Sequence, residues 1–198
     1  DNQAIFGTPS VADCFVALLS ALGITQKKIK GLRRPPTPTH SSITSSLAVV
    51  YCSQALCNLL DGSAAVERND NGTTTLQEIF GTTAMRDALV ALMVTDGIYS
   101  ETKKKVVQEE EADGEHKEGE DVAGVDAEVM EWMSRAVCSL TSGQKDASVR
   151  DLFGTTAMRD ALVAMLRRIP TLAVRARHRQ RLMRVIRWTA TAISNMAY

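Results

Sequence analysis

The chain has 198 residues, a formal net charge of zero and 44% hydrophobic residues, so it is long enough to bury a substantial core as one domain. The zero net charge provides no overall attraction to nucleic acid or an anionic membrane, and no apolar run reaches the ~18 residues of a membrane span. The N-terminus DNQAIFG has neither the basic nor the apolar region of a signal peptide. Because four cysteines also fall within helical patterns, we expect reduced thiols and an intracellular, cytoplasmic location.

The first third of the chain indicates three helices. A short helix ends at Phe6-Gly7, and a second is expected from Thr8 to about Leu22. Thr8 precedes a proline, which is favoured at the first helical position. A basic, proline-containing insert over residues 23–41 follows, and a long helix is expected from about Ser42 to Leu60.

The middle of the chain follows the same order. Leu76, Ile79 and Phe80 have helical spacing, and Gly81 lies where a helix commonly ends. A second helix is expected over residues 82–95. An insert over residues 96–124 holds a run of acidic side chains, so it is interpreted as disordered. A long helix is then expected over residues 126–142.

The last third is the clearest example. Val149, Leu152 and Phe153 predict a short helix that ends at Gly154, and Thr155 is a predicted N-cap. The next helix has one apolar face with the spacing i, i+3, i+4, i+7, i+8, and we expect Pro170 to close it. A longer helix follows, with one face formed by Leu182, Val185, Ile186, Thr189, Ile193 and Met196.

A twelve-residue phrase, FGTTAMRDALVA, accounts for this similarity. It occurs at residues 80–91 and again at 153–164, and a degraded copy covers residues 6–18. Self-similarity at a fixed period is the signature of a stacked repeat array. The chain is therefore predicted to be all-α and to form one domain over 1–198, composed of units near 1–62, 63–143 and 144–198. Because it lacks an initiator Met and opens inside the weak copy, we interpret it as a fragment of a longer array.

The long helices carry the most specific resemblance. The stretches Cys52–Leu59, Met133–Leu140 and Thr189–Met196 each place a small Ala before an aliphatic residue. With the glycine that ends each first helix, this resembles the armadillo repeat, the three-helix unit of importin alpha and beta-catenin. The resemblance implies a right-handed α-solenoid whose third helices line a concave groove. It departs from importin alpha at the groove Trp position, which here holds Gln54, Arg135 and Thr191.

The helical register predicts which side chains share that groove, because residues three and four apart lie on one helix face. Stepping back three from the lost Trp position gives an aromatic residue in each unit: Tyr51, Trp132 and Trp188. We expect these rings to form a row along the groove, flanked by the polar side chains Gln54, Asn58, Arg135, Ser139 and Asn195. The alternative is that the rings pack between units as core.

Arginines extend this row in the last unit. Residues 167–187 contain eight Arg and no acidic residue, and Arg177, Arg181 and Arg184 continue the stripe of Trp188. Guanidinium groups suit carboxylate or phosphate partners. The sequence thus predicts a binding module for an extended acidic or phosphorylated peptide, with nucleic acid a weaker option. The alternative is a structural scaffold, one stretch of a long array without a discrete ligand groove.

No catalytic constellation is apparent. The three histidines, His40, His116 and His178, have no common metal spacing, and there is no phosphate-binding loop or nucleophile motif. Arg86-Asp87 and Arg159-Asp160 recur, but duplication explains them without chemistry. We therefore expect a non-enzymatic protein with no cofactor, no metal, no small-molecule substrate and no membrane partner.

Overall fold

The computed structural model describes the backbone of residues 6–30, 40–61, 66–67, 73–94, 118–142, 148–172 and 179–197, and side chains over slightly shorter ranges. The labelled helices are α2 (Pro9–Lys30), α3 (His40–Leu60), α4 (Leu76–Phe80), α6 (Glu118–Thr141), α7 (Ser148–Phe153), α8 (Thr156–Leu172) and α9 (Arg179–Ala197). Residues 83–94 are also helical. The predicted all-α class is confirmed, apart from two-residue strands β1 (Val66–Glu67) and β2 (Thr73–Thr74), which pair antiparallel.

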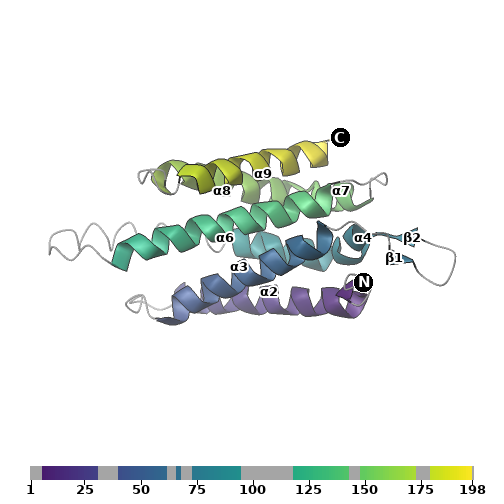
Figure 1. Cartoon of the computed structure of the whole chain (residues 1–198), viewed down its shortest axis with the longest axis horizontal. Coiled ribbons are helices and arrows are strands. Elements are labelled where there is room, and N and C mark those ends of the chain that lie inside the picture. Colours follow the sequence, from purple (N-terminus) through teal and green to yellow (C-terminus); the bar gives the residue numbers. More distant parts are fainter. Residues whose placement is uncertain are drawn as a thin grey trace.

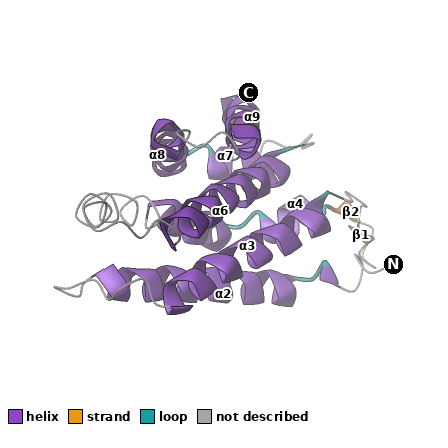
Figure 2. Cartoon of the chain, turned by 60° about the vertical axis from the view of Figure 1, so that its left-hand side comes forward, coloured by secondary structure: helices purple, strands orange, loops and turns teal. Residues whose placement is uncertain are grey.

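The helices succeed one another across the molecule in chain order (Figure 1). α2 and α3 lie near the N-terminus, and α8 and α9 lie side by side at the other end, next to the C-terminus (Figures 1 and 2). The long helix α6 packs against α3 on one side and against α9 on the other. Among the described residues, none of the helices combines the length and apolar character needed to cross a bilayer.

The repeated phrase adopts the same local structure in both copies. The N–H of Gly81 donates to the carbonyl of Gln77, and that of Gly154 donates to the carbonyl of Arg150. The next residue then caps the following helix. Thr82 Oγ1 accepts from the N–H of Met85 at 3.2 Å, and Thr155 Oγ1 accepts from that of Met158 at 3.3 Å. The cap predicted at Thr155 is confirmed, and Thr82 forms the same cap in the first copy. Both caps satisfy helix donors that have no intrahelical partner.

The degraded copy keeps the cap. Thr8 Oγ1 accepts from the N–H of Val11 at 3.4 Å, and Pro9 occupies the first helical position. Ahead of the middle copy, Thr75 and Glu78 form a capping box that starts α4. The short helix α4 and the helices that follow Thr8, Thr82 and Thr155 therefore start at positions that the sequence specifies locally.

The apolar residues of all these helices meet in one buried cluster. Phe80 and Phe153, which open the two copies of the phrase, are 0% exposed. Phe80 also contacts Phe15 edge to face, with the ring centroids 5.9 Å apart, so α2 and α4 share this part of the core. The remaining large, fully buried side chains are Leu and Met from several helices.

Two predicted inserts are shorter than expected. α2 continues to Lys30, so residues 23–30 of the basic insert are helical, and α6 starts at Glu118 inside the acidic insert. The expected loop or disorder over residues 31–39 and 96–117 lies outside the described residues, as do His116 and His178.

Two further details differ in the last third. Pro170 does not close α8, which continues to Leu172. The proline lies in the last turn, where its missing N–H removes a single intrahelical bond. On α9 the buried face consists of Leu182, Val185, Thr189 and Ala192. Ile186, predicted on this face, is 37% exposed.

Candidate binding face on the long helices

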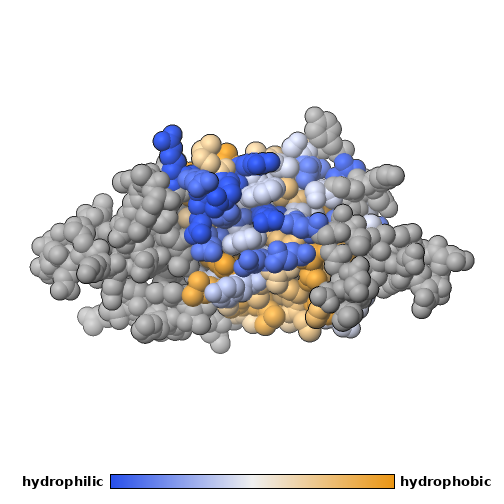
Figure 3. All heavy atoms as spheres, viewed as in Figure 1, coloured by the Kyte–Doolittle hydropathy of each residue, from blue (hydrophilic) through white to orange (hydrophobic). Residues whose placement is uncertain are grey.

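The three long helices α3, α6 and α9 lie foremost in Figure 1, in that order across the molecule. We call their shared surface the long-helix face; the predicted groove residues that the structure describes belong to these three helices. In the same view, hydrophilic side chains gather over α6 and α9, and hydrophobic ones are more frequent toward α2 (Figure 3). The face is thus mainly polar where α6 meets α9.

Trp132 of α6 and Trp188 of α9 lie on either side of one arginine. The guanidinium carbon of Arg135 is 5.1 Å from the ring centroid of Trp132 and 5.6 Å from that of Trp188. Both rings are partly buried and pack against the core. They are therefore neither wholly core nor wholly free, because each packs inward while also contacting a cation.

Arg135 also links α6 to α3. Its Nη2 forms an ion pair with Asp61 Oδ2, and Ser139 Oγ donates to the other carboxylate oxygen of Asp61 at 3.1 Å. Asp61 directly follows the last residue of α3. One carboxylate at the end of α3 thus holds two of the predicted polar groove residues, Arg135 and Ser139, in place.

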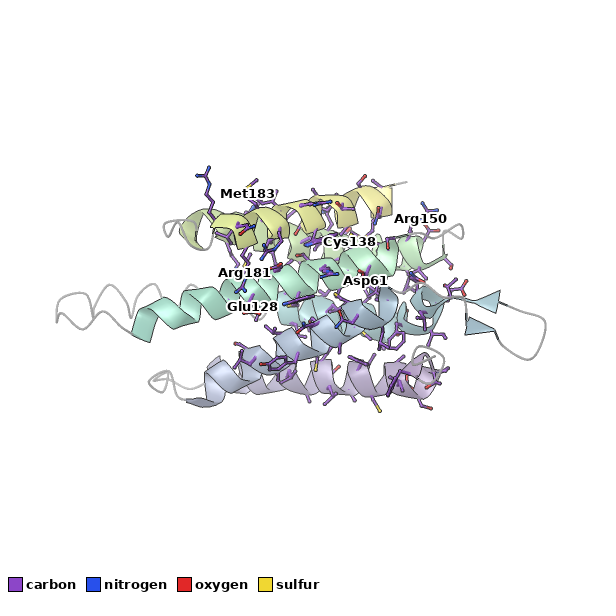
Figure 4. The ribbon with its side chains drawn as sticks, viewed as in Figure 1. Asp61, Glu128, Cys138, Arg150, Arg181 and Met183 are labelled. Atoms are coloured by element: carbon purple, nitrogen blue, oxygen red, sulfur yellow. The ribbon has the colours of Figure 1, made fainter. Side chains whose placement is uncertain are left out.

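Arg181 and Arg184 are held by carboxylates of α6. Arg181 lies 3.0 Å from Glu128 and 3.2 Å from Glu131, and Arg184 Nε donates to Glu131 at 2.5 Å. Figure 4 shows Glu128 and Arg181 pointing toward one another between α6 and α9. The hydrogen bond from Arg184 to Glu131 raises the pKa of the arginine above its usual value. The carboxylates of α6 therefore fix the direction of both guanidinium groups.

The other predicted residues lie outside this set of arginine and carboxylate contacts. Tyr51 and Asn58 are exposed on α3, and Gln54 between them is half-buried. Asn195 of α9 donates to Thr141 Oγ1 of α6 at 3.4 Å. The described contacts do not join the three α3 side chains to the Trp132–Arg135–Trp188 cluster. Arg177 lies outside the described residues.

The sequence reasoning missed the carboxylates that organise this face. Asp61 lies three residues after Asn58, and Glu128 lies four residues before Trp132, so continuing the same i+3 and i+4 steps would have included both. Glu131, four residues before Arg135, lies at the edge of the same stripe and is buried. It contacts Arg181 and Arg184 because α9 packs on that side of α6, which only the tertiary arrangement reveals.

The arrangement offers hydrogen-bond donors and aromatic surface. Among the residues with a described structure, no three His, Cys, Asp or Glu side chains cluster as metal ligands would. The charged groups of the face neutralise one another in pairs across the helix boundaries. Such a surface can hold a ligand by exposed edges of its side chains.

The buried thiols near this face give a testable pH dependence. Burial raises the pKa of Cys57 to about 12 from 9.0, with Arg135 opposing the effect. Because the pKa is higher in the folded state, its contribution to stability is complete below pH 9 and is lost as the pH rises toward 12. We expect Cys14, which is exposed, to react with iodoacetamide in the folded protein at about pH 8, and Cys57 to react only after unfolding. Mass spectrometry of the labelled peptides measures this, and equal labelling of both thiols would contradict the burial.

No family model, curated protein or solved structure matches this chain.

Proposed function

We propose that the chain is a stretch of right-handed α-solenoid made of about three armadillo-like units, and that it is a protein-interaction module. In this proposal, an extended peptide binds along the long-helix face. The single observation that carries it is the part-exposed Trp132–Arg135–Trp188 cluster between adjacent long helices. Support for the three-unit organisation comes from the shared caps and the identical phrases described above.

The face would bind a peptide through side chains already fixed in position. Arg135 has its position set by Asp61 and the two tryptophans, so little side-chain entropy remains to be lost on binding. Tyr51, 64% exposed at the start of the row, adds aromatic surface on α3. The amides of Gln54, Asn58 and Asn195 are of the type that hydrogen-bond a peptide backbone.

The proposed ligands are acidic or phosphorylated peptides, although carboxylates of the chain already occupy some of the arginine donors. Arg181 and Arg184 are not isolated cations, since Glu128 and Glu131 occupy part of their donor set. A guanidinium has five N–H donors, and the described bonds of Arg184 use its Nε and Nη2. The internal carboxylates orient the arginines and lower the positive potential, so we expect binding that is moderate and sensitive to salt.

Peptide binding at low ionic strength tests this proposal. A labelled poly-Glu peptide should bind and a poly-Lys peptide should not. Glu128→Gln with Glu131→Gln should tighten poly-Glu binding by about tenfold, because about 1.4 kcal/mol of competing attraction is removed. Tyr51→Ala should weaken it, with no change in thermal midpoint because this ring is exposed.

The matched control is Arg159→Gln, which removes an exposed arginine from α8, outside the long-helix face. It should leave the affinity for poly-Glu unchanged. The proposal is wrong if poly-Lys binds equally well, or if the control and the face substitutions have the same effect.

The second candidate, a structural scaffold segment, is favoured by a different observation. Large apolar side chains are exposed at both ends of the helix stack: Phe6 and Leu18 at the α2 end, and Met183 and Ile186 on α9. Figure 4 shows Met183 at the edge of α9 remote from α6. Under this candidate, the long-helix face would bind neither peptide, and the ends would hold neighbouring units.

A further inference from the structure

Two identical sequences in this chain have different surroundings. The copy of FGTTAMRDALVA at residues 80–91 is covered by α7. Arg86 Nη1 donates to the carbonyl of Leu152 at 3.1 Å, in the last turn of that helix. A methyl group on the α-carbon of Gly81 would lie 2.6 Å from Cγ1 of Val149. Gly81 and Arg86 together form what we call the α7 seat, which receives an aliphatic side chain and the carbonyl end of a short helix.

At residues 153–164, the second copy has the equivalent glycine and arginine, and both are exposed. Gly154 is exposed, and the nearest atoms to its vacant side-chain position are backbone oxygens of Arg150, Met196 and Asp151. The side chain of Arg159 is 63% exposed, whereas that of Arg86 is 19% exposed. Arg159 contacts the neighbouring Asp160 in the way that Arg86 contacts Asp87. The second copy therefore has the residues needed to pack against a short helix, as the first copy packs against α7.

The long helices repeat this contrast. When the long helices are aligned on Tyr51, Trp132 and Trp188, the same six positions are buried in α3 and in α6. The next long helix packs against each of these two helices. In α3 they are Val49, Val50, Ser53, Leu56, Cys57 and Leu60; in α6 they are Met130, Glu131, Ser134, Val137, Cys138 and Thr141. In α9 five of the six are exposed and Ile193 is half-buried; the exposed ones are Ile186, Arg187, Ala190, Ser194 and Ala197.

The charges at these six positions determine which kind of helix could pack on α9. Among the six buried positions of α6, the charged residue is Glu131, which forms ion pairs with Arg181 and Arg184 of the next long helix. The equivalent position on α9 is Arg187, which is exposed and stacks on Trp188 at 5.5 Å. The charge on the receiving side is therefore reversed, and a helix packed there needs acidic residues where α9 has Arg181 and Arg184.

We propose that α8 and α9 together form a docking surface for one further helical unit of the same kind. Its short helix sits on Gly154 and Arg159, and its long helix carries two acidic residues toward Arg187. A second copy of this chain does not meet the requirement. Its α3 has Thr44 and Leu47 at those two positions, so Arg187 would be covered without a carboxylate partner.

The test adds such a unit to the intact chain. Residues 144–198 are repeated after Tyr198, with Arg181→Glu and Arg184→Glu made in the added copy only; the matched control keeps both arginines. Hydrogen exchange in α9 should slow by about tenfold or more with the acidic copy, and by less with the control. Arg187→Glu in the original unit should remove this protection. Equal exchange with the acidic and basic copies would overturn the proposal.

A measurement on the unextended chain keeps the test decisive if the added unit fails to fold. Arg86→Ala should speed exchange in α7, and Arg159→Ala should leave exchange unchanged everywhere. If Arg86→Ala has no effect on α7, the seat does not operate and the proposal fails. Sedimentation provides the other arm, since self-association of the chain that Arg159→Ala abolishes would assign the surface to a second copy and overturn the proposed occupant.

Discussion

Replacement of Phe80 or Phe153 by alanine is expected to lower the free energy of unfolding by about 3–5 kcal/mol, whereas Phe6→Ala should lower it by less than about 1 kcal/mol. All three residues precede Gly-Thr at the start of a helix cap. They differ in surroundings, because Phe80 and Phe153 are 0% exposed and Phe6 is 50% exposed. The set therefore separates burial from local sequence.

The physical reason is the cavity left in the core. Phe80 packs against Phe15 and Phe153 lies in the same buried cluster, so truncation loses both transfer free energy and contacts that the surroundings cannot replace. Urea denaturation followed by far-ultraviolet circular dichroism measures the change. A similar loss at all three positions would mean that the shared motif acts through its local turn, and would contradict the burial argument.

Much of the fold follows from short-range patterns in the sequence. Thr155 caps its helix as expected, Thr8 and Thr82 form the same cap, and the glycines end the first helices of the second and third thirds of the chain. Caps depend on residues within three positions of one another, so the sequence alone specifies them. The C-terminal end of α2 and the start of α6 were less predictable, because both lie inside charged segments of a kind that is usually solvated and disordered.

The binding face was predicted less completely. Helical register placed Trp132, Arg135 and Trp188 on a common surface, and their contacts agree with it. The register could not show that Glu131 meets Arg184, since this pair depends on how two helices pack across 53 residues of chain. It also could not show which apolar positions of α9 stay exposed, because the equivalent positions are buried on α3 and α6.

Gly81→Ala is expected to cost about 3 kcal/mol, at the upper end of overpacking effects, and Gly154→Ala less than about 1 kcal/mol. The backbone at Gly81 has φ −78°, so alanine is not excluded by conformation. The cost at Gly81 arises because there is no room for a methyl group. A methyl group there would lie 2.4 Å from the Gln77 carbonyl oxygen and 2.6 Å from Val149, whereas at Gly154 its closest neighbour, the Arg150 carbonyl oxygen, is 3.1 Å away.

A double-mutant cycle identifies which neighbour causes the cost. Val149→Ala removes the methyl groups that α7 places over Gly81, so Gly81→Ala should cost about 1 kcal/mol less in that background. The remaining cost comes from the Gln77 carbonyl, which belongs to the same short helix in every variant. Denaturation midpoints of the four proteins measure the coupling. If the two costs simply add, α7 does not press on Gly81, and the difference between the two glycines arises within their own helices.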